Sequence, residues 1–314
     1  HCMHCHGSTG AGDGPTAKYL HPLPRDYRLG KYKFISTGSP DGLPSRNDLT
    51  RILREGIPGT YMPSFYPALG EREMASVVEY IRWLSMQGQY AEGITSEAAF
   101  VYGEEAVAER LAAEEGLTRE DIVQELIDYW PDDVTGKLSF VGSMIAENWQ
   151  AVENEPPVTP AEPQPELEGD ELAASIERGK AIYLQKSTQC ASCHGARGVG
   201  NGSQTVSVLI DAATGEPYDE AGVHDVWGNV VRPRNLTRGI YRGGRRPIDL
   251  YRRVYAGIPG SNMPGFGGNL SDEQIWDLVH FLIALPLDPS LLNDATLEEA
   301  EPSAVAALEQ ADRS

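Results

Sequence analysis

The chain of 314 residues is poor in cysteine, poor in positive charge and free of long apolar runs. No window comes near the roughly 18 consecutive apolar residues of a membrane-spanning helix, which excludes such a helix within these residues. Its 4 cysteines are fewer than a secreted disulfide scaffold carries in a much shorter chain. Lys and Arg total 26 against 46 Asp and Glu, and basic residues cluster only as an Arg run in the second half, so we expect no nucleic-acid partner.

The acidic excess is concentrated in one part of the chain and in its tail. Residues 91–170 carry 20 acidic and 3 basic side chains, a net charge of −17, and residues 287–314 carry 7 acidic and 1 basic, a net charge of −6. Residues 1–90 and 171–286 are nearly neutral, with net charges of +2 and +1. The length suffices for about two domains, so we expect the neutral blocks to be the domains and residues 91–170 to join them.

The two neutral blocks contain the same three sequence elements in the same order, which indicates an internal repeat. The aligned pairs are Cys5–Pro15 with Cys193–Ser203, Asp48–Phe65 with Asp249–Phe266, and Glu71–Leu84 with Asp272–Leu285. His6 precedes Met62 by 56 positions, and His194 precedes Met263 by 69. The second copy therefore holds 13 additional residues, which we place in Ser207–Gly228.

Apolar residues at helical spacing predict the helices of each copy. A short helix, Asp48–Glu55 or Asp249–Ala256, ends at Gly-Ile-Pro-Gly, because glycine stops a helix and proline cannot continue it. A longer helix follows, at Gly70–Met86 in the first copy and at Ser271–Leu285 in the second. A further helix is predicted at Leu172–Gln185, ahead of the second cysteine pair, and the first copy has no counterpart of it.

The segment between the copies has two parts. Ser96–Trp130 is acidic with helical periodicity, and Glu153–Gly169 is rich in Pro and Glu, which is typical of a semi-rigid extended linker. Docking onto a basic partner and service as a solvated spacer are both open for the acidic part. The acidic tail, residues 287–314, is expected to be disordered.

Each copy contains the motif C-x-x-C-H, in "HCMHCHG" and in "QCASCHG" (Gln189–Gly195). This motif is the attachment signature of haem c, because two thiols three positions apart can bond to the two vinyl groups at one haem edge while the histidine ligates iron. A zinc site would need four converging ligands, whereas Cys2 and Cys190 lie 188 positions apart. A thioredoxin-like pair would need a βαβ context, and the sequence shows none.

A methionine follows each motif in the same frame, "GIPG-x-x-MP", at Met62 and Met263. One histidine and one methionine on haem iron is the electron-transfer arrangement, in which methionine raises the potential. The proline after each methionine favours an extended backbone that aims the sulfur. The methionines outside this frame are interpreted as packing residues: Met3, Met74, Met86 and Met144.

From the C-x-x-C-H motif to the last helix, each copy resembles class I cytochrome c. The resemblance covers Cys2–Leu84 and Leu172–Leu285. "CHGSTGAGDGP", "DVWGNVVRPRNLTRGIYRGG" and "DLYRRVYAGIPGSNMPGF" are similar to a mono- and dihaem cytochrome subfamily that occurs as subunits or partners of bacterial respiratory complexes. The resemblance implies an all-α fold of two tandem cytochrome c domains, residues 1–90 and 171–286, joined by the acidic helical and Pro-rich residues 91–170.

The resemblance also implies two haem c groups and their ligands. The thioether bonds would form at Cys2, Cys5, Cys190 and Cys193. His6 and His194 would be the proximal iron ligands, and Met62 and Met263 the distal ones.

The surroundings of the ligands are predicted less directly. A ligating histidine usually donates its second N–H to a carbonyl, which we expect from the loops Gly10–Pro15 and Gly198–Ser203. Pairing with haem propionates and exposure to solvent are both open for five arginines: Arg25, Arg28, Arg232, Arg234 and Arg238. The remaining histidines are interpreted as surface or packing residues: His1, His4, His21, His224 and His280.

The first copy departs from the family pattern because it lacks the N-terminal helix. Residues ahead of His1, a helix from another chain, and an atypical domain are the three explanations, and we favour the first. Such residues could also carry a signal peptide or membrane anchor, since haem c is attached outside the cytoplasm in bacterial members of the family. We therefore expect the chain in the periplasm or on the extracytoplasmic face of the membrane.

The predicted function is electron transfer without catalysis, as a carrier or subunit of a respiratory chain. Its partners would be redox proteins or a membrane respiratory complex. The alternative is a dihaem enzyme such as a cytochrome c peroxidase or thiosulfate dehydrogenase, which needs one haem with a displaceable ligand. The two copies agree at the distal methionine, which favours the carrier.

Overall fold

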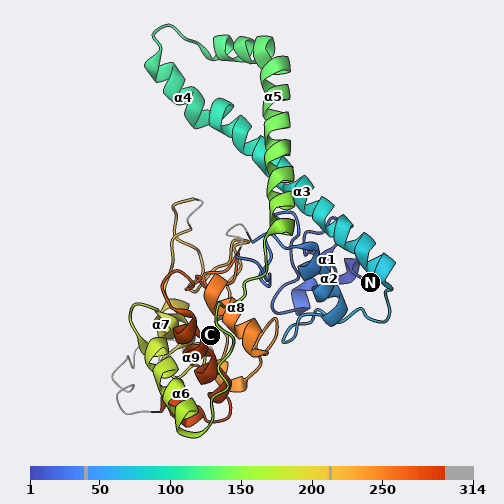
Figure 1. The fold of residues 1–314 in the computed structure, drawn as a ribbon. Helices are drawn as coiled ribbons and strands as arrows, with labels where there is room; N and C mark the ends of the chain where they lie inside the picture. Colours follow the sequence, from blue (N-terminus) through green and yellow to red (C-terminus); the bar gives the residue numbers. More distant parts are fainter. Residues whose placement is uncertain (39–41, 212–213, 294–314) are drawn as a thin grey trace. The chain divides into compact units, whose positions relative to one another are not determined.

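The computed structural model describes residues 1–38, 42–211 and 214–293. Every regular element in this part of the chain is a helix, accompanied by three isolated β-bridges, and the predicted all-α fold is confirmed. Two compact units are formed (Figure 1): unit 1 comprises His1–Lys31 with Leu69–Glu155, and unit 2 comprises Tyr32–Ala68 with the residues from Pro156 onward. Unit 2 thus contains residues of both sequence copies, and the domain boundaries at residues 90 and 171 stay predictions.

Unit 1 is built on one long helix, α3 (Glu71–Tyr102), joined by α1 (Met3–His6), η1 (Ala17–Tyr19), α4 (Glu104–Ala113) and α5 (Arg119–Asn154). The predicted end of α3 at Met86 is wrong. Its interior glycines do not stop it, because each is a site of close packing: a Cβ on Gly88 would lie 2.1 Å from the carbonyl oxygen of Arg28, and one on Gly93 would lie 2.7 Å from Val141.

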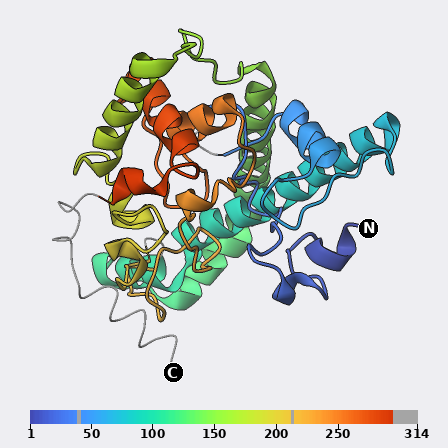
Figure 2. The ribbon, with the colours of Figure 1, turned by 90° about the horizontal axis from the view of Figure 1, so that it is seen from below.

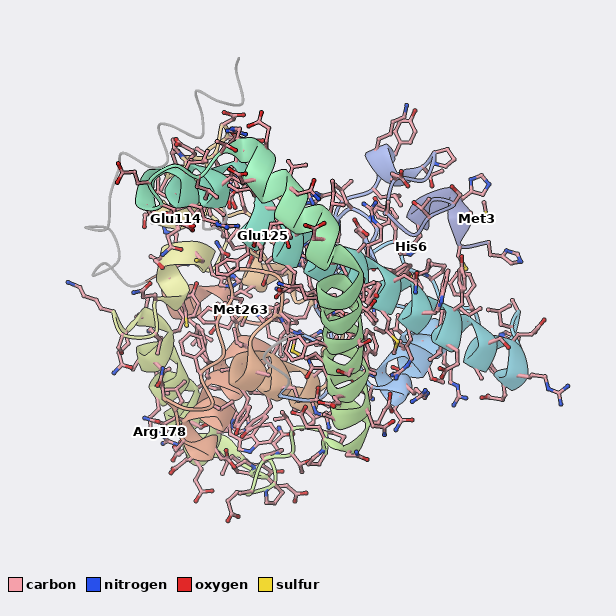
Figure 3. The ribbon with its side chains drawn as sticks, turned by 90° about the horizontal axis from the view of Figure 1, so that it is seen from above. Met3, His6, Glu114, Glu125, Arg178 and Met263 are labelled. Carbon is pink, nitrogen blue, oxygen red and sulfur yellow. The ribbon has the colours of Figure 1, made fainter. Side chains whose placement is uncertain are left out.

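Helix α5 packs against α3 through Trp149, which is fully buried. The indole N–H of Trp149 donates to Gln89 Oε1 at 2.7 Å, and the guanidinium of Arg82 lies 4.8 Å from the indole ring. Arg82 also pairs with Glu153 of α5. Further out, Arg110 of α4 pairs with Glu125 of α5 at 2.8 Å (both helices meet near the labelled Glu114 and Glu125 in Figure 3). The helical periodicity predicted over residues 96–130 is confirmed for residues 96–102, 104–113 and 119–130, and residues 114–118 form a break between α4 and α5.

Unit 2 contains α2 (Arg46–Glu55), α6 (Gly169–Leu184), α7 (Cys190–His194), α8 (Pro247–Ala256) and α9 (Asp272–Ala284), with the short helices η2 (Ser203–Thr205), η3 (Leu236–Arg238) and η4 (Pro289–Leu292). Helix α6 lies across α9, as seen in the two perpendicular views of Figures 1 and 2. The crossing is at Gly179, where a Cβ would lie 2.1 Å from the carbonyl oxygen of Asp277. Tyr183 and Phe281 fill the adjacent core, both at most 1% exposed.

Of the linker predicted at Glu153–Gly169, residues 155–168 form no helix, whereas Glu153 and Asn154 end α5 and Gly169 begins α6. The non-helical residues from Pro156 onward pack within unit 2. The amide of Val158 donates to the carbonyl of Ser36 at 2.7 Å, and Arg252 Nε donates to the carbonyl of Val158 at 2.9 Å. Trp276 Nε1 donates to the carbonyl of Glu162 at 3.1 Å. The linker is therefore held by hydrogen bonds at several points along its length.

Two predictions concern the ends and the surface of the chain. The tail predicted at 287–314 is described only to residue 293, and its first part forms η4 with Leu292 fully buried; residues 294–314 lie outside the described residues. Within the described ranges, no helix combines the length and the apolar character needed to cross a bilayer.

Candidate functional site

Both C-x-x-C-H motifs fold into a single helical turn, α1 and α7, closed by glycine. Gly7 and Gly195 follow the histidines with φ of 74° and 81°, a region that favours glycine. The next loop returns over the turn, with Gly14 N–H donating to Cys5 O and Gly202 N–H donating to Cys193 O, each at 3.1 Å. A side chain on Gly202 would meet the carbonyl oxygen of Ser192 at 2.2 Å, so the loop can lie this close only without one.

Both motif histidines are held in the same tautomer by a backbone carbonyl. His6 Nδ1 lies 3.0 Å from the carbonyl oxygen of Arg25, and His194 Nδ1 lies 2.9 Å from that of Arg234. A carbonyl can only accept, so Nδ1 carries the proton and Nε2 keeps the lone pair that a metal needs. Burial lowers the pKa of both histidines, which outweighs the opposing hydrogen bond and keeps the rings neutral.

The prediction that the loops Gly10–Pro15 and Gly198–Ser203 supply these carbonyls is wrong. The loops instead hold the segments that do: Tyr27 N–H donates to Gly10 O at 2.9 Å, and Leu236 N–H donates to Gly198 O at 2.7 Å. The loop and the segment that it holds can lie this close because the loop residue at the contact is glycine: a Cβ on Gly200 would lie 2.5 Å from the carbonyl oxygen of Pro233. Each loop therefore positions the carbonyl to which the histidine donates, but does not supply that carbonyl.

None of the four cysteines forms a disulfide. Cys5 Sγ lies 3.4 Å from Thr16 Oγ1, and Cys193 Sγ donates to Gln204 Oε1 at 3.1 Å. Burial raises the pKa of Cys190 and of Cys193, whereas a redox-active C-x-x-C pair lowers the pKa of one thiol. No group of three or more His, Cys, Asp or Glu side chains able to hold a metal ion occurs among the described residues.

The first methionine loop follows α2 and is closed by its own hydrogen bonds. Gly56, at φ 72°, ends the helix, and a Cβ there would lie 2.7 Å from the carbonyl oxygen of Met62. Ile57 N–H donates to Met62 O at 3.0 Å. Thr60 Oγ1 donates to Ile57 O at 2.8 Å and accepts from Met62 N–H at 3.1 Å. The methionine backbone is thus fixed on both sides.

The second methionine loop, after α8, repeats each of these contacts. Gly257 has φ 73°, and Ile258 N–H donates to Met263 O at 3.0 Å. Ser261 Oγ stands in for the threonine hydroxyl, donating to Ile258 O at 2.7 Å and accepting from Met263 N–H at 3.3 Å. Met62 and Met263 are both half-buried. The shared "GIPG-x-x-MP" frame therefore encodes one loop geometry, built twice.

The structure places the predicted ligands in the two units as follows. Cys190, Cys193, His194 and Met263 all belong to unit 2, with Met263 labelled in Figure 3. Cys2, Cys5 and His6 belong to unit 1, and Met62 belongs to unit 2. The ligand role of these eight residues stays a prediction of the sequence.

The two histidine sites differ in one neighbour. The ring of Tyr27 stacks on that of His6 with centroids 4.7 Å apart, and its hydroxyl lies 3.1 Å from His6 Nε2. The equivalent position in the second copy, two residues after the acceptor carbonyl, is Leu236, which is buried.

Sequence reasoning missed Arg242. Its Nε is buried without a hydrogen-bond partner, and burial lowers the pKa of the guanidinium, aided by the charge of Arg234. Arg242 lies eight residues after Arg234, and in the first copy Lys33 lies eight residues after Arg25. Alignment of the two copies could therefore have shown a basic residue at this position in both. Of the arginines predicted, Arg28 pairs with Asp26, Arg234 bonds to the carbonyl of Ile240, and Arg232 and Arg238 are exposed.

These observations fit haem c in the second copy. Cys190 and Cys193 lie on one helical turn and form no disulfide, and Nε2 of His194 keeps its lone pair. The buried Nε of Arg242 lacks a hydrogen-bond acceptor, which a haem propionate would provide. The other histidines agree with their predicted packing or surface roles. His280 is 6% exposed and bonded to Ser175 at 2.8 Å, and His224 is buried against Tyr218.

Comparison with known proteins adds three findings. A family model described as cytochrome c matches residues 1–85 and 176–286. The curated proteins compared include no match. Among solved structures, a chain of the "Kuenenia stuttgartiensis reducing HAO-like protein complex Kustc0457/Kustc0458" is similar, with 27% sequence identity and a TM-score of 0.57 over 91% of this chain and 91% of that chain.

Proposed function

The chain belongs to the cytochrome c family, and we propose that it transfers electrons through two haem c groups, each ligated by one histidine and one methionine. Family membership implies covalently bound haem c and haem-based electron transfer. The number of haems and their axial ligands are our proposal. It rests above all on the two methionine loops, whose hydrogen bonds are the same in both copies.

Haem iron supplies the one-electron Fe(II)/Fe(III) couple. The residues of the chain would attach the haem, orient the ligands of the iron and tune its potential. The cysteines of each turn would hold the haem edge, and the Nδ1–H···O=C bond keeps each imidazole neutral and aimed. A thioether ligand favours Fe(II) and so raises the potential. In the second site, Arg242 would neutralise a propionate that approaches its buried Nε.

We propose further that the chain acts as a non-catalytic electron-transfer subunit. With histidine and methionine both bound, an iron would have no open position for substrate. The dihaem peroxidase or dehydrogenase alternative needs one methionine loop to differ, and the hydrogen bonds that hold Met62 and Met263 are the same in the two loops.

The partner we propose is a redox protein complex of the kind named for the similar structure, a reducing HAO-like protein complex. The similarity extends over 91% of both chains, so it includes much of the acidic helical segment as well as the two copies. A periplasmic or other extracytoplasmic location is part of the same proposal.

The test is spectroscopic and uses the full chain matured with haem in a bacterial periplasm. A pyridine haemochrome assay should give two haems per chain, and the ferric protein should show the near-infrared methionine–iron charge-transfer band. Met62→His and Met263→His should each remove half of that band and lower one potential. Met144→Leu, at an exposed methionine outside the frame, is the control.

A band unchanged by either substitution would contradict the ligand assignment. A high-spin ferric fraction in the unmodified chain, or turnover with peroxide or thiosulfate, would favour the enzyme instead.

A further inference from the structure

The acidic segment between the two copies folds into a helical hairpin that consists of the last part of α3, from residue 91 onward, with α4 and α5 (Figure 1). Residues 91–154 carry 15 acidic and 3 basic side chains, a net charge of −12. Each basic side chain is already paired within the hairpin: Arg110 with Glu125 at 2.8 Å, Lys137 with Glu97 at 3.1 Å, and Arg119 with Glu104. The charge that the hairpin presents to an approaching molecule is therefore strongly negative.

Three large apolar side chains of this acidic hairpin are exposed to solvent, and we call them the hairpin face. Phe100 of α3 is 82% exposed, and Phe140 and Met144 of α5 are 57% and 44% exposed. The interior of the hairpin is formed by other side chains, such as Val141 and Trp149, which are at most 5% exposed. The hairpin face therefore contributes little to the packing of the hairpin itself.

Contacts between α3 and α5 show that the three side chains lie on one side of the hairpin. Glu97 of α3 pairs with Lys137 of α5. A Cβ on Gly93 would lie 2.7 Å from Val141, so the two helices run in opposite directions. The members of the hairpin face stand three residues after Glu97, Lys137 and Val141, which places each about 60° back from the contact line at 100° per residue. Equal turns of the same sense on antiparallel helices point to the same side.

Exposed aromatic and methionine side chains that are grouped in this way mark a contact surface. Protein interfaces are enriched in aromatic residues and methionine at their centre, and polar residues form the rim. A solvated spacer would need the charges of the hairpin but not its exposed aromatic rings. Of the two roles that the sequence leaves open for the acidic segment, docking therefore fits the structure.

We propose that the hairpin face docks a protein whose contact surface has an apolar centre and a rim of lysine and arginine. Charge complementarity supports this occupant. A net charge of −12 repels nucleic acids and anionic lipid surfaces, and it also repels a second copy of this chain, whose own net charge is −20. The inference rests on the proposed function in one respect, since the docked protein would be the redox partner of the chain.

The first experiment measures binding of the full haem-loaded chain to a defined probe, a small basic cytochrome c whose haem edge is surrounded by lysines. Phe140→Ser removes an aromatic ring from the centre of the contact and should weaken binding by about fivefold or more. Ile127→Ser is the matched control, because Ile127 is 61% exposed on the same helix and lies about 140° around it from Phe140. This control should change the Kd by less than about twofold.

The ionic strength and the charge of the probe provide the second test. Raising the ionic strength from about 10 mM to about 150 mM should weaken binding roughly tenfold, because the screening length falls to about 8 Å. An acidic cytochrome c of similar size should not bind. Absence of binding to the basic probe at low salt, equal binding of the two probes, or equal losses in the two variants would overturn the proposal.

Hydroxyl-radical footprinting of the complex with the basic probe locates the contact directly. Labelling of the hairpin face should fall, while labelling at Ile127 should stay at its level in the unbound chain, and the reverse pattern would contradict the proposal. The haem content and the near-infrared band of the same samples separate this result from the proposed function. Unchanged spectra in a chain that does not dock would refute the docking surface alone, and a missing haem or band would refute the haem and ligand assignment alone.

Discussion

The phenol of Tyr27 stacks on the imidazole of His6 and places its hydroxyl 3.1 Å from Nε2, while the equivalent position of the second copy holds Leu236. Because Nδ1 of His6 donates to Arg25, Nε2 is the acceptor and the phenol is the donor. In the structure the nitrogen proposed to bind iron accepts this phenol hydrogen bond in the first copy, and the equivalent position of the second copy holds a leucine. Iron bound at Nε2 would replace the hydrogen bond. Two sites with matching ligands need not have matching potentials.

The substitution Tyr27→Leu should raise the potential of one haem. An apolar neighbour stabilises the less charged ferrous state, and the shift should be on the order of 50 mV, which is roughly 1 kcal/mol for a one-electron couple. Spectroelectrochemical titration of the full chain resolves the two waves. The reciprocal change Leu236→Tyr should lower the other wave, and movement of the same wave in both variants would refute the assignment.

The hydroxyls of Thr60 and Ser261 should each hold one methionine in place. Thr60→Ala removes two hydrogen bonds of the Met62 loop, and Ser261→Ala removes the same two from the Met263 loop. Each loss should weaken the methionine–iron bond by about 1 kcal/mol. The alkaline loss of the charge-transfer band should then begin at lower pH for one haem in each variant. Thr60→Ser should restore the original behaviour, and failure of that rescue would point to packing instead.

Gly179→Leu should destabilise unit 2 by roughly 1–3 kcal/mol or more, because its side chain would overlap the backbone of Asp277 and force α6 away from α9. Urea unfolding of the haem-loaded chain measures the effect. Ala174→Leu lies on the same helix at an exposed position and should change stability by no more than about 0.5 kcal/mol. Similar losses in both variants would mean that the crossing does not limit stability.

The stability of unit 2 should fall on acidification because of His280. Burial lowers the pKa of His280 from its ordinary value of 6.5; Asp277 raises it and Arg178 lowers it further. The unfolded chain then takes up the proton at higher pH than the folded chain does, so stability is present above about pH 6.5 and decreases as the pH drops below it.

The residues facing His280 are Ser175 and Arg178 of α6, Asp277 of α9 and Gln164 of the linker. Comparison with His280→Asn isolates its contribution, since all other titrating groups are shared. Urea midpoints at pH 7 and pH 5 should differ more for the unmodified chain than for the variant. An equal difference would exclude His280 as the source.

The local parts of the fold were predictable from sequence, because local chemistry determines them. The ends of α2 and α8 follow from Gly56 and Gly257, and the two methionine loops follow from a shared frame of eight residues. A single C-x-x-C-H motif or a single methionine would have been weak evidence for a haem ligand. Their occurrence twice in the same frame made the interpretation specific.

The parts that sequence reasoning missed depend on contacts between distant segments. The end of α3 could not be placed because Gly88 and Gly93 look like helix breakers until Arg28 and Val141 are seen against them. The carbonyls of Arg25 and Arg234 were missed for the same reason, since they lie 19 and 40 positions from their histidines. Burial of the Arg242 guanidinium leaves no trace in local composition.

The hydrogen bonds of the Pro- and Glu-rich linker should protect it from limited proteolysis. A stretch rich in proline and glutamate would ordinarily be the first place attacked by a protease. Here Val158 and Glu162 have their backbone groups engaged by Ser36, Arg252 and Trp276, and a protease needs a free, extended backbone. The connection between α4 and α5, around the exposed Gly116, has such a backbone. Brief digestion should therefore cut the chain between α4 and α5 and leave the linker intact.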